Sequence, residues 1–260
     1  MKTLIICHEG DYLSEKFIPR WLNSFSHPTG IIVLREKRAQ FFKRIYYEIK
    51  RSGIINLLDV FAFRLYYSFF ISKKDKSWLY QKIKSIANKY PQPHNIPILY
   101  TYSPNTSEAR NFIREHSPDM MIALCKILIE KSIFSIPSKG TFVIHPGICP
   151  EYRNSHGCFW ALYNNQISKV GATLLKIDEG IDTGPVYGYY KCKYDGSSDS
   201  HIVIQQKAIF QNLEKIKNKL IEIYRGSARV IDSSGRKSAV WGQPSLTKYL
   251  IWKNRARGNK

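Results

Sequence analysis

The hydrophobic positions of this chain form short β-branched runs that alternate with longer segments of helical spacing. Apolar runs typical of buried strands lie at residues 3–7, 30–34, 96–100, 119–124, 142–144, 170–177 and 185–190. Helical patterns occupy residues 11–23, 105–116, 157–165 and 202–224. Strands that alternate with helices are typical of an α/β domain. We therefore predict a Rossmann-like, mostly parallel sheet of about seven strands with helices on both faces.

Two local features refine these helices. Asn105 and Glu108 have the spacing of a capping box, so we expect the helix over 105–116 to begin with Asn105 as its N-cap. Trp160 lies in the helix predicted over 157–165, and we expect it in the core.

Residues 35–90 depart from the alternating pattern. They contain fourteen Lys and Arg against four acids. The insertion is dense in aromatic side chains, which include Phe41, Phe42, Tyr46, Tyr47, Phe61, Phe63, Tyr66, Tyr67, Phe69, Phe70 and Trp78. Between residues 57 and 71 only Asp59, Arg64 and Ser68 are polar, so a helix there would be apolar around most of its circumference.

Three interpretations of this segment are open. We favour a helix buried against the sheet or a partner, because core helices are far commoner than membrane-docking ones. The second interpretation is a surface helix that lies in a membrane interface, with its basic neighbours facing anionic headgroups. The third is nucleic-acid binding by interleaved basic and aromatic side chains. A membrane span is not expected, because we find no run of roughly 20 apolar residues.

Length and composition are those of one main domain, over residues 1–225, with the 35–90 insertion and a short basic tail over 226–260. The five cysteines are scattered and lack C-x-x-C spacing, which favours a reducing cytoplasm over a disulfide or zinc framework. The first apolar run is too short for a signal peptide. A formal net charge of +20 suits partners that carry phosphates.

Candidate chemistry is concentrated in residues 141–185. The run 142–144 ends at His145, and Pro146-Gly147 terminates the strand. Ligands of open α/β sheets bind beyond the carboxyl ends of the strands, so His145 lies where catalytic side chains gather. The turn D-E-G-I-D-T-G after residues 170–177 carries three carboxylates. An imidazole and a carboxylate could share a pocket there; a structural histidine and an ordinary turn are the alternatives.

These residues resemble the formyltransferase family, which includes methionyl-tRNA formyltransferase, glycinamide ribonucleotide transformylase and sugar N-formyltransferases. The family pattern is approximately N-x-H-x-x-x-x-P-x-[YWF]-[RK]-G, followed by a D-x-G-x-D-[TA]-G loop. The matching residues are His145, Pro150, Tyr152, Arg153, Asp178, Gly180, Asp182 and Gly184. The resemblance implies that His145 and Asp182 are catalytic.

The chain departs from this pattern at the family's catalytic asparagine, which is replaced by Val143. An amide there helps to stabilise an oxyanion, and one such donor is worth about 2.7–4 kcal/mol. We consider Asn154 and His156 as substitute donors and Arg153 as a substrate contact. Without a substitute, the protein would be a catalytically silent module that binds folate or a partner.

The resemblance also implies a formyl donor, 10-formyltetrahydrofolate, and no metal. In the family, the stretch after the fourth strand and the D-x-G-x-D loop line the folate pocket. The corresponding residues here are Lys126, Ile127, Leu128, Asp178, Gly180 and Ile181.

The acceptor is expected to be a small amine, and we favour an amino sugar linked to a nucleotide or a lipid, because such substrates carry the phosphates that a +20 protein attracts. A methionyl-tRNA formyltransferase-like enzyme is the alternative. Methionyl-tRNA formyltransferase carries an additional barrel domain that helps to hold tRNA. Residues 226–260 are too few to form such a domain, which counts against tRNA as the acceptor. We expect a cytoplasmic protein, peripheral at the inner face of the membrane if the insertion docks there, and leave its oligomeric state open.

Overall fold

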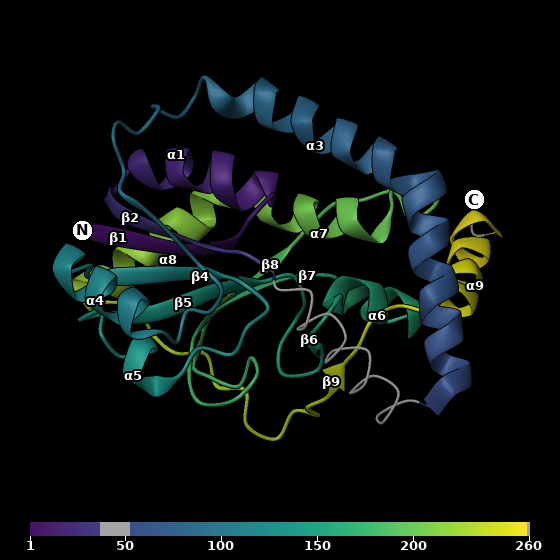
Figure 1. Cartoon of the computed structure of the whole chain (residues 1–260). Coiled ribbons are helices and arrows are strands. Elements are labelled where there is room, and N and C mark those ends of the chain that lie inside the picture. The colour runs from purple at the N-terminus through teal and green to yellow at the C-terminus, as the bar shows by residue number, and fades with distance from the viewer. Residues whose placement is uncertain (37–52, 259–260) are drawn as a thin grey trace.

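The fold is built on a seven-stranded sheet (Figure 1), in a computed structural model that describes residues 1–36 and 53–258. The strand order is β3-β2-β1-β4-β5-β7-β8. The first five strands in this order pair in parallel, whereas β7 and β8 run antiparallel to their neighbours. The prediction of a mostly parallel sheet of seven strands is confirmed. The strands are β1 (Lys2–His8), β2 (His27–Leu34), β3 (Ile98–Thr101), β4 (Met120–Leu124), β5 (Gly140–His145), β7 (Gly171–Lys176) and β8 (Val186–Lys191).

Helices cover both faces of the sheet because the central strands are apolar on both sides. Ile5 and Cys7 of β1 point into one core layer, and Leu4 and Ile6 point into the other; all four are fully buried. The first layer lies under α1 (Ile18–Asn23), α3 (Ser72–Ala87), α7 (His201–Phe210) and α8 (Leu213–Arg225). The second lies under α4 (Ser107–His116) and α5 (Lys131–Phe134).

The start of α4 differs by one residue from the prediction. Thr106 is the N-cap, and its side chain accepts a hydrogen bond from the Ala109 amide. Asn105 instead donates to the Leu128 carbonyl and accepts from the Glu130 amide, at 2.9 Å each. The capping prediction for Asn105 is therefore wrong: its side chain is used to tie the start of α4 to the segment after β4.

The helical pattern over 202–224 is broken into α7 and α8 at Asn212. The side-chain amide of Asn212 is buried and donates to the carbonyls of Ala208 and Lys191, at 2.9 Å each. An asparagine that binds nearby carbonyls in this way competes with the helical backbone. The spacing of apolar residues continues across the break, which is why the sequence reads as one helix.

The insertion contains a helix over Gly53–Ala87 that changes direction near a π-helical segment, Tyr67–Ile71 (Figure 1). Val60 and Phe63 are buried on one side of it. The opposite side is exposed to solvent, so the interpretation of a buried helix holds for one face only. Residues 37–52, with the aromatic residues predicted between 41 and 47, lie outside the described part of the chain.

This helix is long and apolar enough to cross a membrane by length and composition, with a mean hydropathy of 1.5 over its most apolar window. Polar residues interrupt its apolar run, so the sequence contains no uninterrupted run of roughly 20 apolar residues, and length and composition alone do not make this helix a membrane span. Only 11% of that window is buried inside the protein. The helix thus differs from the core helices of soluble proteins, which can be equally long and apolar but are mostly buried.

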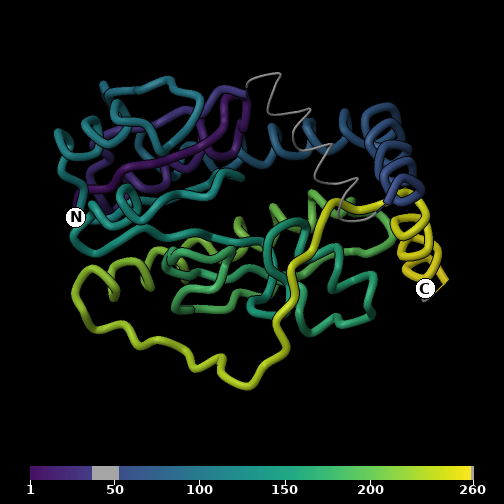
Figure 2. Tube along the Cα trace, turned by 60° about the horizontal axis from the view of Figure 1, so that its bottom comes forward, coloured from purple at the N-terminus to yellow at the C-terminus, as the bar shows by residue number. Residues whose placement is uncertain are grey.

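The segment after α8 folds back across the molecule (Figure 2). Its strand β9 (Val240–Trp241) pairs in parallel with β6 (Arg153–Asn154). Its helix α9 (Leu246–Gly258) packs against α6 (Gly157–Tyr163) and lies beside the first half of the Gly53–Ala87 helix (Figures 1 and 2). The basic tail therefore packs against the loop that follows β5.

The two sides of the Gly53–Ala87 helix predict opposite outcomes for two neighbouring phenylalanines. Phe63 is 5% exposed and lies 4.9 Å from the Tyr249 ring, measured between ring centroids. Phe63→Asp should prevent soluble folding, because it loses the about 3–5 kcal/mol of a large core truncation and also buries an unpaired charge. Phe61, which is 55% exposed, is the matched control, and Phe61→Asp should remain folded. Soluble yield and thermal unfolding by circular dichroism measure both; a stable Phe63→Asp protein would contradict this packing.

Candidate active site

His145 is the last residue of β5 and is 4% exposed. Its Nδ1 lies 3.3 Å from an Asp182 carboxylate oxygen. Its Nε2 lies 2.7 Å from the backbone carbonyl oxygen of Tyr152. The structure therefore brings the predicted imidazole and carboxylate into contact, and a backbone carbonyl fixes the orientation of the ring.

Asp182 reaches His145 by an indirect route. Because β7 is antiparallel to β5, with Thr173 opposite His145, the chain leaves β7 at the end of the sheet away from His145. The loop over 178–184 must fold back over the sheet. Gly184 permits this fold, since a Cβ there would lie 1.9 Å from the Lys176 carbonyl oxygen. Asp182 itself has a φ of +51°, a left-handed conformation that Asp and Asn tolerate better than most residues.

The interior of this loop is organised by its first carboxylate. Asp178 accepts hydrogen bonds from the Gly180 amide at 3.0 Å and from the Thr183 hydroxyl at 2.6 Å, both at the same oxygen. Such side-chain to backbone bonds are typical of Asx turns. Asp178 and Gly180, predicted to bind the cofactor, thus shape the loop that carries Asp182.

Arg153 and Asn154 join the two halves of the motif. The Asn154 amide donates to the Asp182 carboxylate at 2.8 Å, and the Arg153 guanidinium donates to the Ile181 carbonyl at 3.0 Å. The side-chain amide of Asn154 donates to the Trp241 carbonyl at 2.7 Å. In this conformation Asn154 therefore acts through its backbone, and its side chain is occupied by the C-terminal strand.

His156 forms its hydrogen bonds with groups other than the His145–Asp182 pair. Its ring nitrogens contact the side-chain amides of Gln243 at 3.1 Å and Gln205 at 3.2 Å, and its ring packs on His201. Burial lowers the pKa of His156 to about 4, so it is neutral at pH 7. Both substitute donors considered for the missing asparagine are thus engaged with other groups.

Val143 lies on the same side of β5 as His145, two residues earlier. Its side chain packs against an apolar cluster that contains Cys149, Leu175 and Val186, with Tyr189 at the edge. A valine suits this environment because it needs no hydrogen-bond partner. No oxyanion donor is supplied from this position.

A polar network that the sequence analysis did not identify holds the loop after β5. Arg236, from the segment after α8, donates to both carboxylate oxygens of Glu151, at 3.0 and 2.6 Å, and also to the Tyr189 hydroxyl. Lys169 binds the same carboxylate at 2.8 Å. Burial alone would raise the pKa of Glu151, but these hydrogen bonds outweigh it and hold the pKa below its usual value. The only signal in the sequence is an acid placed inside the motif.

The residues predicted to line a folate pocket lie on two segments that the fold holds together. An exposed ion pair joins Lys131 to Glu179 at 3.0 Å. Ile127 packs in the same core layer as Ile177, and the Lys126 amide donates to the His8 ring at 2.9 Å. Apolar side chains remain exposed on both segments, Leu128 at 55% and Ile181 at 44%. Exposed apolar groups beside backbone polar groups fit a flat heterocycle such as a pterin.

Comparison with known sequences identifies a family. The family model described as "Formyl transferase" matches residues 31–219. A methionyl-tRNA formyltransferase of Thermotoga maritima is 30% identical over 149 residues, which are 54% of this chain and 46% of that protein. Another, from Kosmotoga olearia, is 31% identical over 105 residues, 40% of this chain and 32% of that protein. The chain therefore spans less than half the length of these two relatives.

Solved structures share the fold at low sequence identity. A sugar N-formyltransferase from Shewanella sp. superposes with a TM-score of 0.56 and 13% identity, covering 98% of this chain and 87% of that one. A phosphoribosylglycinamide formyltransferase from Anaplasma phagocytophilum superposes with a TM-score of 0.54 and 12% identity, covering 94% and 99%. At this identity the likeness concerns the fold alone.

The surroundings of Val143 predict the effect of restoring an asparagine. Val143→Asn should lower the free energy of unfolding by about 1–3 kcal/mol, because the amide enters an apolar cluster where it finds no partner. We expect no gain in catalytic rate. Denaturant unfolding and turnover measure the two effects. A rate increase approaching the ~100–1,000-fold worth of one oxyanion donor would show instead that the natural site lacks a donor which position 143 can supply.

Proposed function

This chain belongs to the formyl transferase family, and on that premise we propose that it transfers the formyl group of 10-formyltetrahydrofolate to the amino group of a phosphate-bearing amino sugar. Enzymes of this family use that donor. The observation that carries the proposal is the contact of His145 Nδ1 with the Asp182 carboxylate, at 3.3 Å and largely buried. It pairs an imidazole with a carboxylate at the end of a strand, where acid–base catalysis can act on a bound amine.

The donor supplies the formyl carbon. In the overall reaction the acceptor nitrogen forms a bond to that carbon, the bond from the carbon to the donor nitrogen breaks, and one proton passes from the acceptor nitrogen to the donor nitrogen. The protein therefore has to hold both nitrogens near the carbon, stabilise negative charge on the formyl oxygen and move one proton.

His145 is suited to the charge on the formyl oxygen. Its Nε2–H donates to the Tyr152 carbonyl, so Nδ1 is the nitrogen that faces Asp182 and the loop. A proton on Nδ1 would be shared between the Asp182 carboxylate, 3.3 Å away, and a formyl oxygen bound beside it, so Nδ1 is the ring nitrogen that can donate to the developing oxyanion. The nearby carboxylate of Asp182 orients the ring.

Asp182 is suited to the proton transfer. One of its oxygens is held by the Asn154 amide, and its side chain is 14% exposed. A carboxylate that is fixed in place and still reachable by solvent can accept the proton of the attacking amine through a water molecule. His145 and Asp182 would then act as a unit.

The donor would be held by residues 126–128 and by the 178–181 loop. The exposed side chains of Leu128 and Ile181 offer apolar contact for the pterin ring, and the Lys131–Glu179 ion pair keeps the two segments together. Both segments approach the His145–Asp182 pair, one along the neighbouring strand β4 and one through Asp182 itself.

Two observations support an amino sugar as the acceptor. The net charge of +20 favours a substrate that carries phosphate. The segment over 226–245 lies against the loop after β5, with β9 paired to β6. This segment closes one side of the site, which favours a small acceptor. Methionyl-tRNA is the second candidate, favoured by the names of the sequence relatives at about 30% identity.

The catalytic pair predicts a specific kinetic defect. His145→Ala and Asp182→Asn should each lower kcat by about 100–10,000-fold, because acid–base catalysis and charge stabilisation are lost from the transition state. Asparagine tolerates the positive φ at position 182, so this variant should fold. Affinity for the donor should change little, as measured by fluorescence titration.

The exposed His94 provides a matched control, and His94→Ala should keep wild-type kcat. Full activity in His145→Ala would remove His145 from the mechanism.

The choice of acceptor is tested by mass spectrometry after incubation with 10-formyltetrahydrofolate, nucleotide-linked amino sugars and initiator methionyl-tRNA. We expect the mass increase of one formyl group on an amino sugar. Formylation of tRNA, with a steep loss of activity as salt is added, would establish the second candidate instead. Donor binding without formyl loss to any acceptor would indicate a silent binding module and would contradict the proposal.

A further inference from the structure

The exposed side of the Gly53–Ala87 helix carries a continuous apolar stripe. Its side chains recur at the three- and four-residue spacing of one helix face. They are Ile54, Leu58, Phe61, Leu65 and Phe69, with exposures of 65%, 61%, 55%, 45% and 78%. A stripe of five large, solvent-exposed apolar side chains on one helix is far from the scattered single residues that soluble surfaces tolerate.

The opposite side of this helix is bound to the rest of the protein. The Phe63 ring packs on Tyr249, and the Tyr66 ring lies 6.1 Å from the same ring. Asp59 accepts a hydrogen bond from the Thr247 amide at 3.0 Å, at the start of α9. These contacts hold the stripe outward. They also argue against a transmembrane helix, because crossing a bilayer would require all of them to break.

The charges around the stripe are predominantly positive. Lys73, Lys74 and Lys76 are exposed just beyond its C-terminal end. Within the described residues of this helix and of α9, the acids are Asp59, which binds the start of α9, and Asp75, which is buried. The solvent-facing charge beside the stripe is therefore basic.

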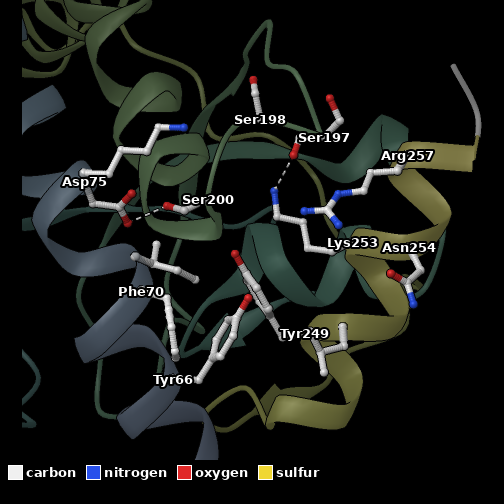
Figure 3. A pocket seen from close by; sticks show the side chains of 13 residues that line it. Tyr66, Phe70, Asp75, Ser197, Ser198, Ser200, Tyr249, Lys253, Asn254 and Arg257 are labelled. Carbon is white, nitrogen blue, oxygen red and sulfur yellow. Dashed lines mark hydrogen bonds between the residues drawn. The ribbon is translucent and has the colours of Figure 1, made fainter.

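A cavity of about 240 Å³ lies on the packed side of the helix, between the Tyr67–Ile71 segment, the loop over 197–200 and α9 (Figure 3), and none of the stripe residues lines it. Its one lining carboxylate, Asp75, accepts hydrogen bonds from Ser200 at 2.6 Å and from the Tyr67 hydroxyl at 2.9 Å. Lys253 donates to three backbone carbonyls of the 196–199 segment. The remaining cationic side chains of the lining are Lys74 and Arg257.

We propose that this face docks on the surface of an anionic phospholipid bilayer, with the stripe inserted at the boundary of the acyl chains. Lys73, Lys74 and Lys76, exposed just beyond the C-terminal end of the stripe, contact the lipid phosphates. Apolar anchoring combined with basic residues is the pattern of helices that lie in membrane interfaces. A second copy of the chain fits less well, because packing stripe against stripe would bring two sets of basic residues together. The proposal does not depend on the identity of the acceptor or on catalysis.

Vesicle flotation of the full-length protein tests the proposal without substrate. Wild type should bind vesicles that contain phosphatidylglycerol, should bind pure phosphatidylcholine much more weakly, and should release as salt is raised. Leu58→Ser/Phe61→Ser/Phe69→Ser should weaken binding by at least about 100-fold, because each large apolar side chain contributes roughly tenfold or more to partitioning. Lys73→Glu/Lys76→Glu should remove most of the preference for the anionic lipid.

The matched control is Ile167→Ser/Val230→Ser, which removes two side chains of similar exposure, 56% and 54%, from elsewhere on the surface. It should bind like wild type. Circular dichroism melts confirm that each variant is folded, as expected for exposed positions.

Equal binding of the triple variant and the control would overturn the proposal, as would failure of folded wild type to bind anionic vesicles. If light scattering instead showed a dimer that only the triple variant dissociates, and vesicles were not bound, the stripe would be an interface between copies of the chain and the proposal would be wrong.

Discussion

The site depends on the two hydrogen bonds that tie Arg153 and Asn154 to the 178–184 loop. The Asn154 amide holds the Asp182 carboxylate, and Arg153 holds the preceding carbonyl. They hold the loop that follows an antiparallel strand over the sheet, with its carboxylate against His145. The bond to the carboxylate is charge-assisted, and such hydrogen bonds are roughly twice as strong as those between neutral groups. The position of the Asp182 carboxylate is thus decided by contacts with the loop after β5, although Asp182 itself follows β7.

The C-terminal segment supports the loop after β5, which carries Arg153 and Asn154. Arg236 holds Glu151, and the Trp241 ring stacks between Tyr152, at 5.6 Å, and Trp160, at 4.7 Å. The aromatic cluster continues through α6 to α9 and to Phe63 of the insertion helix. One continuous core therefore joins the candidate active site to the helix that carries the exposed stripe. If this helix docks on a bilayer, the same core holds the candidate active site at a defined distance from the bilayer.

Local physics accounts for most of what the sequence predicted correctly. Buried parallel strands need β-branched runs that are apolar on both sides, so the strands of the sheet can be predicted from the apolar runs along the sequence. The failures concern side chains that hydrogen-bond beyond their own segment: Asn105 binds residues 128–130, and Asn212 binds Lys191. The prediction of a buried insertion helix was incomplete for a related reason. An all-apolar helix has no polar stripe to show which side faces the core, and only its contacts with α9 decide that Phe63 is buried and Phe61 exposed.

The sequence by itself determined the motif residues, and with them the family, because the stretch from His145 to Arg153 is followed by the D-E-G-I-D-T-G loop in the order of the family pattern. It could not determine how they meet. Neither the antiparallel direction of β7 nor the return of the 178–184 loop is encoded in a local pattern, since both depend on pairing with strands far away in the chain. The engagement of Asn154 and His156 with Trp241, Gln205 and Gln243 likewise depends on long-range packing. Tertiary structure alone decided these contacts, because a hydrogen bond between distant residues leaves no periodicity in the sequence.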